Sequence, residues 1–353
     1  MSNRRLLGLP IASRRTTLAA SLALFAYYVA TMCRSLSMYD SPELALVAEQ
    51  LGLGHPFGQP LHTLIGGALA RIPGVDPLIA LNGLSALASA LTVVPATSFA
   101  EALLRPDDDS PDGDRRLIAP TIALLGLHPA LWEPATRIEV YPLAGFFALW
   151  AAARFVHAVL DGDAERPPYY GTGLALGLSA SANVVCAVGV ALAMVPRLLI
   201  ASFRREIPRP AIAWISLGGL LGLSTYAYVF VVAGRTDVFV WGSPTDPGSI
   251  VHYFSGADFS SKSVDSISIW IDHVGAILIA AIRSGIFGIW VVGFVGYALY
   301  ARRRGLGRLF YNLTWIFFVG FIARNGVFAP DVLDYVGYLA IPTWVAAAGT
   351  LSL

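Results

Sequence analysis

The sequence predicts an all-α polytopic membrane protein, and three observations support this. Of its 353 residues, 56% are hydrophobic and only 13% are charged, whereas soluble domains carry roughly 25% charged residues. Several apolar stretches reach the length of about 20 residues that a helix needs to cross the hydrocarbon. The formal net charge of +1 gives no field that would attract a polyanion. This composition disfavours a soluble globule, a disordered chain and a nucleic-acid binder.

We expect about ten transmembrane helices. The first apolar run lacks a convincing signal-peptide cleavage site, so we expect a retained span. The stretch 170–203 is too long for one span and is polar at its middle, which predicts two short helices with a turn near Asn183. Counting that stretch twice, the expected spans are 16–37, 77–104, 117–132, 142–160, 170–203, 211–233, 271–299, 309–323 and 335–353.

The distribution of Lys and Arg predicts the orientation, because cytoplasmic loops carry an excess of both. With the N-terminus in the cytoplasm, the inner loops hold fifteen of these residues and the outer loops six. This bias favours a plasma membrane, and the Ala/Leu/Arg-rich composition favours a bacterial inner membrane. We expect one transmembrane domain over 1–353, without a soluble C-terminal domain, and outer loops at 38–76, 133–141, 234–270 and 324–334. Long loops are often functional, so we expect the active site on the periplasmic or extracellular face.

The first outer loop carries two carboxylates at a helix start. Ser41 before Pro42 is typical of a hydroxyl N-cap followed by proline at the first helical position, which predicts a short helix at the membrane surface. Asp40 and Glu43 then lie at its N-terminal end. They can cap the helix, act as general base and orienting group, or bind a metal, and their spacing does not distinguish these roles. His55 lies in a Gly- and Pro-rich turn, and we expect it to be held near Asp40.

The other outer loops hold further candidates. Glu139 and Tyr141 stand at the entry of the fourth span, where Glu139 can simply pair with Arg137. An arginine close to hydrocarbon is usually neutralised by a partner. For Arg324 that partner can be a phosphate, which a guanidinium binds in bidentate fashion, or Asp331 or Asp334.

Three blocks of the sequence together resemble a known family. Residues 40–43 (Asp-Ser-Pro-Glu), with 51–52 and 55–61, are similar to its first signature. Trp132 with 139–141 is similar to the second block, and 241–244 (Trp-Gly-Ser-Pro) with His252 and Gly256 to the third. The blocks recur in order over residues 39 to 256. The family is the protein O-mannosyltransferase-like group of the GT-C superfamily of membrane glycosyltransferases, so the resemblance implies a GT-C-like bundle.

The resemblance also implies an activity. A member transfers a sugar, mannose at the family level, from a polyprenyl-phosphate donor to a hydroxyl acceptor on a protein, lipid or glycan, and we expect inversion. Asp40 is then the candidate base and Glu43 the group that orients the acceptor or Asp40. No cofactor is required, and a divalent metal is optional. The donor-phosphate candidates are Arg324, then Arg235, Arg137 and His252, and the sugar or acceptor candidates are His55, Glu139, Tyr141 and Trp241.

Two other functions stay open at this point. Pro42, Phe57 and Val184 depart from the family pattern, which is compatible with a noncatalytic membrane partner. A transporter or flippase of a lipid-linked sugar would share the phosphate-binding arginines. It would also need polar residues through the spans, whereas the acids and arginines here cluster in the outer loops.

Overall fold

The computed structural model describes residues 5–104, 115–160, 166–264, 266–300, 304–324 and 333–351. Within these ranges the regular secondary structure is helical apart from the antiparallel hairpin of β1 (Arg5–Leu6) and β2 (Leu9–Pro10) and an isolated bridge between Leu53 and Val240. In chain order the helices are α1 (Arg14–Thr31), α2 (Ser41–Gln50), α3 (Pro60–Ala70), α4 (Pro77–Leu91), α5 (Val93–Leu104), α7 (Ile118–Leu125), α8 (Pro129–Ala135), α9 (Tyr141–Leu160), α10 (Arg166–Ala182), α11 (Val184–Phe203), α12 (Ala211–Leu223), α13 (Ala227–Val232), α14 (Pro247–Ser255), α15 (Ile267–Ser284), α16 (Ile286–Val295), α17 (Arg304–Ala323) and α18 (Leu333–Thr350). Short 3₁₀ segments η1 (Ser224–Tyr226) and η2 (Ala257–Lys262) and a π-helical segment η3 (Gly296–Tyr300) complete the fold.

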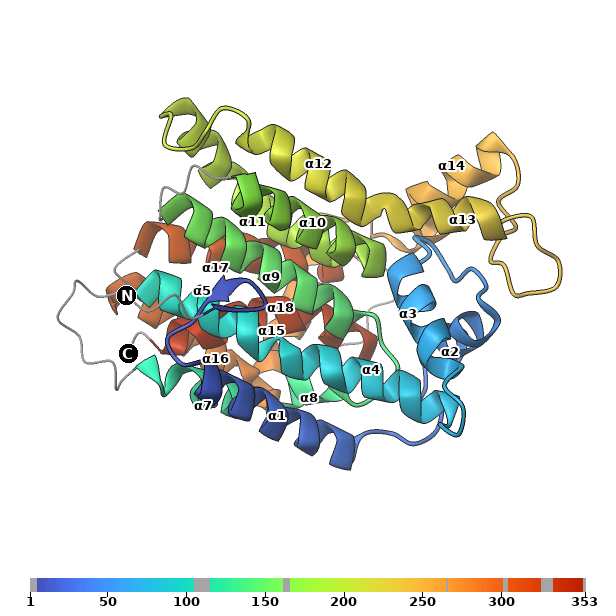
Figure 1. Cartoon of the computed structure of the whole chain (residues 1–353), viewed down its shortest axis with the longest axis horizontal. Coiled ribbons are helices and arrows are strands. Elements are labelled where there is room, and N and C mark those ends of the chain that lie inside the picture. The colour runs from blue at the N-terminus through green and yellow to red at the C-terminus, as the bar shows by residue number, and fades with distance from the viewer. Residues whose placement is uncertain are drawn as a thin grey trace.

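The long helices form a bundle whose two ends differ. Both termini lie at one end, and α2, α3, α13 and α14 lie at the other (Figure 1). That second end gathers the first and third of the loops expected outside the membrane, and we call it the outer end.

Six helices among the described residues are long and apolar enough to cross a membrane. They coincide with expected spans and identify an integral membrane protein with several apolar spans. The six are Pro77–Leu103, Tyr141–Leu160, Val184–Phe203, Ala211–Val232, Ile267–Ser284 and Gly305–Ala323. The other expected spans fall on α1, α10, α18 and the α7–α8 pair, so the total of ten stays a prediction.

Two expected spans are interrupted rather than continuous. The stretch 271–299 breaks at Gly285, whose φ of +78° ends α15 and begins α16. The stretch 117–132 breaks between α7 and α8, because Pro129 starts a new helix that His128 caps. The two breaks face each other, since the His128 ring Nε2 lies 3.2 Å from the Ser284 carbonyl oxygen. Apolarity alone therefore predicted the extent of these stretches but not their breaks.

The predicted turn near Asn183 is confirmed. Asn183 has an extended backbone (φ −158°), and its side-chain oxygen accepts a hydrogen bond from the Cys186 N–H at 3.2 Å. This cap ends α10 and starts α11, so the chain reverses at the outer end of the bundle (Figure 1). The reversal places the turn beside the outer loops.

Glycines bring α10 and α12 into backbone contact. A Cβ at Gly218 would lie 2.1 Å from the Tyr170 carbonyl oxygen, and a Cβ at Gly173 would lie 1.8 Å from that of Ile215. A side chain at either position would force the helices apart. The adjacent Gly219 is different, because its Cβ would meet nothing closer than 3.7 Å.

We therefore expect Gly218→Ala to destabilise the protein by about 1–3 kcal/mol, the usual cost of overpacking. Gly219→Ala is the matched control and should leave the thermal midpoint unchanged or slightly raised, since alanine favours helix over glycine. Thermal unfolding of both variants in one detergent measures this difference. Equal losses in the two variants would contradict the close α10–α12 contact.

Candidate active site

Helix α2 places the two first-loop carboxylates at the outer end. The expected short helix is present, but it begins one residue earlier than predicted. Asp40 is the N-cap, without a side-chain cap bond, and Pro42 lies in the first turn. The Ser41 hydroxyl, expected to cap the helix, instead donates to the Ile138 carbonyl at 2.8 Å. The helix start is thereby fixed to the segment that carries Arg137 and Glu139.

The turn after α2 is held against the large outer loop. The Leu53 N–H donates to the Phe239 carbonyl at 2.8 Å, and the Trp241 N–H donates to the Leu53 carbonyl at 2.9 Å. Glycine is required at Gly52, because a Cβ there would lie 2.2 Å from the Phe239 carbonyl oxygen. Further along the turn, the Tyr253 hydroxyl donates to the Gly54 carbonyl at 2.7 Å. Two loops far apart in sequence thus form one wall of the site.

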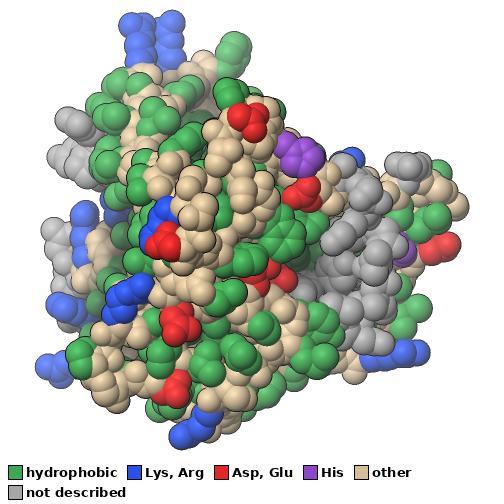
Figure 2. Space-filling view, turned by 90° about the vertical axis from the view of Figure 1, so that its right-hand side faces the viewer, with side chains coloured by type: hydrophobic (Ala, Val, Ile, Leu, Met, Phe, Trp, Pro, Cys, Tyr) green, Lys and Arg blue, Asp and Glu red, His purple; other side chains and the backbone are tan. Residues whose placement is uncertain are grey.

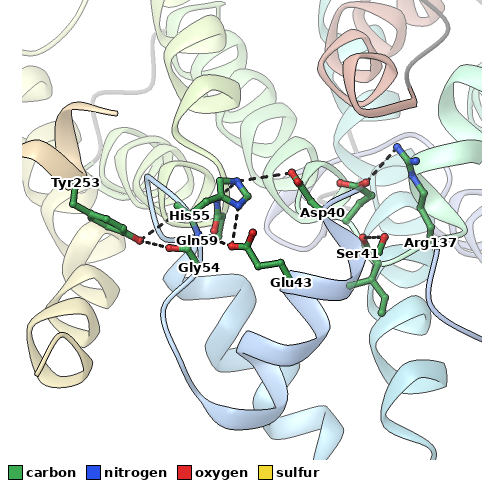
Figure 3. A network of polar contacts seen from close by, with 10 residues as sticks. Asp40, Ser41, Glu43, Gly54, His55, Gln59, Arg137 and Tyr253 are labelled. Carbon is green, nitrogen blue, oxygen red and sulfur yellow. Dashed lines mark hydrogen bonds and ion pairs between the residues drawn. The ribbon is translucent and has the colours of Figure 1, made fainter. Parts of the chain in front are cut away.

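His55 lies near Asp40, as the sequence predicted, and it also contacts Glu43 (Figure 3). Its Nδ1 is 3.1 Å from Glu43 Oε1, and its backbone N–H donates to the same oxygen at 2.6 Å. On the other side of the ring, Nε2 is 3.1 Å from the Gln59 side-chain amide and 3.9 Å from Asp40 Oδ2. The side chains of His55 and Glu43 are 17% and 20% exposed, whereas that of Asp40 is 41% exposed. Asp40 is thus the more accessible of the two carboxylates.

Two opposing effects set the ionisation of Glu43. Burial, the largest single effect, favours its neutral form, but the two hydrogen bonds from His55 and the Coulombic attraction of its ring together hold the pKa of Glu43 below its usual value. Glu43 is therefore a carboxylate at neutral pH. A carboxylate held in this way can orient the imidazole and stabilise its protonated form.

This lowered pKa predicts a pH dependence of stability. A carboxyl group with a folded-state pKa below its unfolded value contributes stability above the unfolded pKa and loses it as pH falls through the folded pKa. We expect the thermal midpoint of the wild type to fall more steeply below pH 4.5 than that of Glu43→Gln. Thermal unfolding of both proteins from pH 7 to pH 3 measures this, and parallel curves would contradict it.

Arg137 lies on the other side of Asp40 from His55 (Figure 3), where it forms a buried ion pair with Glu139. Arg137 Nη2 lies 3.2 Å from Glu139 Oε1, and the two side chains are only 5% and 1% exposed. Ser85 on α4 fixes the segment, because its hydroxyl accepts from the Glu139 N–H at 3.2 Å. The pairing left open by the sequence is therefore present.

Tyr141 is buried beneath this pair. Its ring meets that of Tyr338 on α18 edge to face, with centroids 4.7 Å apart. Tyr338 also lies beside Asn183, so the turn between α10 and α11 reaches the site. The packing places Tyr141 under the site, with its ring against another aromatic side chain.

The large outer loop contributes an aromatic and acidic cluster. Trp241 lies edge to face against the His55 ring, with centroids 6.2 Å apart, and Phe259 does the same at 6.1 Å. The Trp241 Nε1–H donates to Asp258 Oδ2 at 3.1 Å, and His252 Nε2 lies 2.6 Å from Asp258 Oδ1. These bonds hold the pKa of Asp258 below its usual value. Trp241 thus joins the His252–Asp258 pair to His55.

The cations predicted to bind phosphate have different surroundings. Arg235 is paired with Asp237, with Nη2 and Oδ2 2.6 Å apart, on the exposed part of the loop. Arg324 is exposed at the end of α17, and its carbonyl accepts from the Val264 N–H at 2.8 Å. In the described part of the chain, the Arg324 guanidinium has no carboxylate within ion-pair distance. Asp331 and the side chain of Asp334, its alternative partners, lie outside what is described.

Figure 2 shows the outer end face on, with acidic and histidine side chains set among hydrophobic ones. Among the described residues, no group of three or more His, Cys, Asp or Glu side chains is placed so as to hold a metal ion. Around His55 the two carboxylates contact different nitrogens of one ring. Metal dependence stays a prediction.

Sequence reasoning missed three residues that the structure brings to the site, Gln59, Asp258 and Phe259. Gln59 follows the glycines and proline of the turn, and its φ of +38° at the N-cap of α3 points its side chain back at His55. Asp258 and Phe259 belong to η2, where no periodic pattern marks them. The available signal for Gln59 was its position four residues after His55 within the first block.

The fold is similar to that of two solved membrane proteins, ArnT and EmbB. The crystal structure of ArnT from Cupriavidus metallidurans bound to undecaprenyl phosphate is similar at a TM-score of 0.63 and 16% identity, covering 95% of this chain and 59% of that one. The cryo-EM structure of arabinosyltransferase EmbB from Mycobacterium smegmatis is similar at 0.52 and 13%, covering 99% and 32%. The chain thus spans about three fifths of ArnT and a third of EmbB.

Residues 40–206 match the family described as the protein O-mannosyl-transferase TMEM260 N-terminal domain. This part of the chain is similar to that family, so the resemblance predicted from the first two sequence blocks is confirmed. The match begins at Asp40 and contains Glu43, His55, Arg137, Glu139 and Tyr141. A comparison with curated protein sequences finds no match.

Proposed function

We propose that this protein is an inverting glycosyltransferase that moves a sugar from a polyprenyl-phosphate donor to a hydroxyl acceptor on the non-cytoplasmic face of a bacterial plasma membrane. The family match and the similarity to a structure bound to undecaprenyl phosphate support the donor class. Mannose is the sugar we expect, from the family. The cationic bias of the inner loops supports a cytoplasmic N-terminus.

One observation carries the proposal most directly. The exposed Asp40 carboxylate lies at the outer end between the buried Arg137–Glu139 pair and the His55–Glu43 pair. Glu139 is paired with Arg137 and Glu43 is hydrogen-bonded to the His55 ring, so Asp40 is the carboxylate available to an incoming hydroxyl. A carboxylate within hydrogen-bond reach can remove the hydroxyl proton as the oxygen attacks the anomeric carbon. Glu43 supports this role through His55.

The leaving group requires a cation, because the polyprenyl phosphate gains negative charge as the anomeric C–O bond breaks. Of the four candidates, Arg137, Arg235 and His252 are each engaged by a carboxylate of their own. We therefore assign the donor phosphate to Arg324, whose guanidinium has no such partner among the described side chains. Trp241, half-buried beside His55, is the aromatic surface on which we expect the sugar to stack.

The test is sugar transfer by the purified protein reconstituted in sealed lipid vesicles. A panel of labelled polyprenyl-phosphate sugars is offered with cell-envelope acceptors, and free polyprenyl phosphate is quantified with and without EDTA. We expect release from a mannose-type donor, inversion in the product, and no loss with EDTA. Uptake of the intact donor across the membrane without its consumption would favour a flippase, and binding without either would favour a noncatalytic partner.

A further inference from the structure

Both ring nitrogens of His55 contact polar side chains. Its Nδ1 faces Glu43 Oε1 at 3.1 Å, and its Nε2 faces the Gln59 amide nitrogen at 3.1 Å. Because that amide nitrogen is a donor, Nε2 is the acceptor and Nδ1 carries the hydrogen that is donated to Glu43. An imidazole in this tautomer, oriented by a carboxylate, has its basic nitrogen Nε2 next to the Gln59 amide, with Asp40 Oδ2 3.9 Å away.

The distance between His55 and Asp40 suits a proton transfer that follows a small closure. Nε2 lies 3.9 Å from Asp40 Oδ2, about 1 Å beyond a hydrogen bond. Catalytic hydrogen bonds are often long without substrate and tighten in the reactive complex. Gln59 is only 6% exposed, so its amide is held beside Nε2, and Asp40 must displace it there to form the closer contact.

We propose that Asp40, after accepting the proton of the acceptor hydroxyl, transfers this proton to His55 and so returns to its ionised form. This inference rests on the proposed function. In the first step the acceptor O–H proton passes to the Asp40 carboxylate, the acceptor oxygen bonds to the anomeric carbon, and the anomeric C–O bond breaks with its electron pair going to the polyprenyl phosphate. In the second step the proton moves from Asp40 to His55 Nε2, and the imidazolium then loses a proton to water.

The groups around the ring favour its protonated form. From α2, both Asp40 and Glu43 face the ring, and Glu43 stays ionised at neutral pH. From the large loop, the uncharged rings of Trp241 and Phe259 contact it, with the Asp258–His252 pair behind Trp241. From α14, the Tyr253 hydroxyl contacts the backbone carbonyls of Gly54 and His55. His55 and Gln59 act through Asp40 and do not contact the reacting atoms.

The first test needs no turnover. In protein labelled with ¹⁵N-histidine, the His55 signals are assigned by their loss in His55→Gln and followed from pH 4.5 to pH 9. We expect the titration midpoint of His55 to fall by about one pH unit in Asp40→Asn, because a nearby carboxylate favours the charged imidazole. We expect it to rise by a similar amount in Gln59→Glu. A midpoint that is the same in the wild type and Asp40→Asn overturns the proposal.

The second test is the pH profile of sugar transfer. We expect His55→Gln to lower kcat about 10- to 100-fold at pH 7 and to leave the donor KM within twofold. The pH profile of this variant should lack the acid limb of the wild-type profile. Added imidazole should restore part of its kcat. His273→Gln, on α15, should keep the wild-type profile. A His55→Gln profile parallel to the wild type would assign a structural role and overturn the proposal. If the wild type transfers no sugar, the proposed function fails, and the ¹⁵N titration still decides whether Asp40 and His55 share a proton.

Discussion

Asp40→Asn is expected to abolish most sugar transfer while leaving the fold intact. The amide keeps the size of the side chain but cannot accept the hydroxyl proton, so kcat should fall by about 10²- to 10⁴-fold, the usual contribution of general base catalysis. The cost in stability should be small, because Asp40 is 41% exposed and makes no side-chain cap bond. The measurement is release of free polyprenyl phosphate, with thermal unfolding of the same sample.

The chain offers a matched control at Asp246. It too is an aspartate N-cap in an outer loop with proline in the first helical turn, and its side chain accepts from the Gly248 and Ser249 N–H groups. Asparagine caps helices about as well as aspartate, so Asp246→Asn should keep both stability and transfer. Loss of transfer in both variants would mean that the loops, rather than one carboxylate, govern the reaction. Full activity of Asp40→Asn would remove Asp40 from the mechanism.

The sequence was most informative where a physical signal is local. The lengths of the apolar stretches predicted the spans that the structure confirms, and the polar residues near Asn183 predicted the reversal between α10 and α11. Breaks inside apolar stretches were missed, because Gly285 ends a helix through a left-handed backbone conformation that hydropathy does not register. The β1–β2 hairpin was also missed, since only two residues pair in each strand.

The sequence predicted the candidate residues of the first loop more fully than those of the third, where it indicated Trp241 and His252 but missed Asp258 and Phe259. Asp40, Glu43 and His55 lie within sixteen residues of one another, so a short helix and a turn suffice to bring them together. Phe259 contacts His55, and Asp258 is linked to it through Trp241, because Gly52, Leu53 and Tyr253 fix the large loop to the turn. Such contacts depend on tertiary packing, which no pattern in a single sequence encodes.

The second large effect is expected from the buried ion pair. Removing one partner of such a pair leaves an uncompensated charge and typically costs about 3–5 kcal/mol. Arg137→Met would leave Glu139, which is 1% exposed, without its guanidinium, and Glu139→Met would leave the buried Arg137 without its carboxylate. We expect each single variant to lose most of its thermal stability in detergent.

The double variant Arg137→Met/Glu139→Met should recover much of that loss, because two apolar side chains of similar volume can replace a buried pair at little cost. The four proteins form a double-mutant cycle, and a coupling energy below about 0.5 kcal/mol would contradict a buried pair.

The recovered double variant also separates stability from donor binding. If Arg324 holds the donor phosphate, the double variant keeps the wild-type donor KM within about threefold, whereas Arg324→Gln raises the donor KM because it removes a bidentate guanidinium from the leaving group.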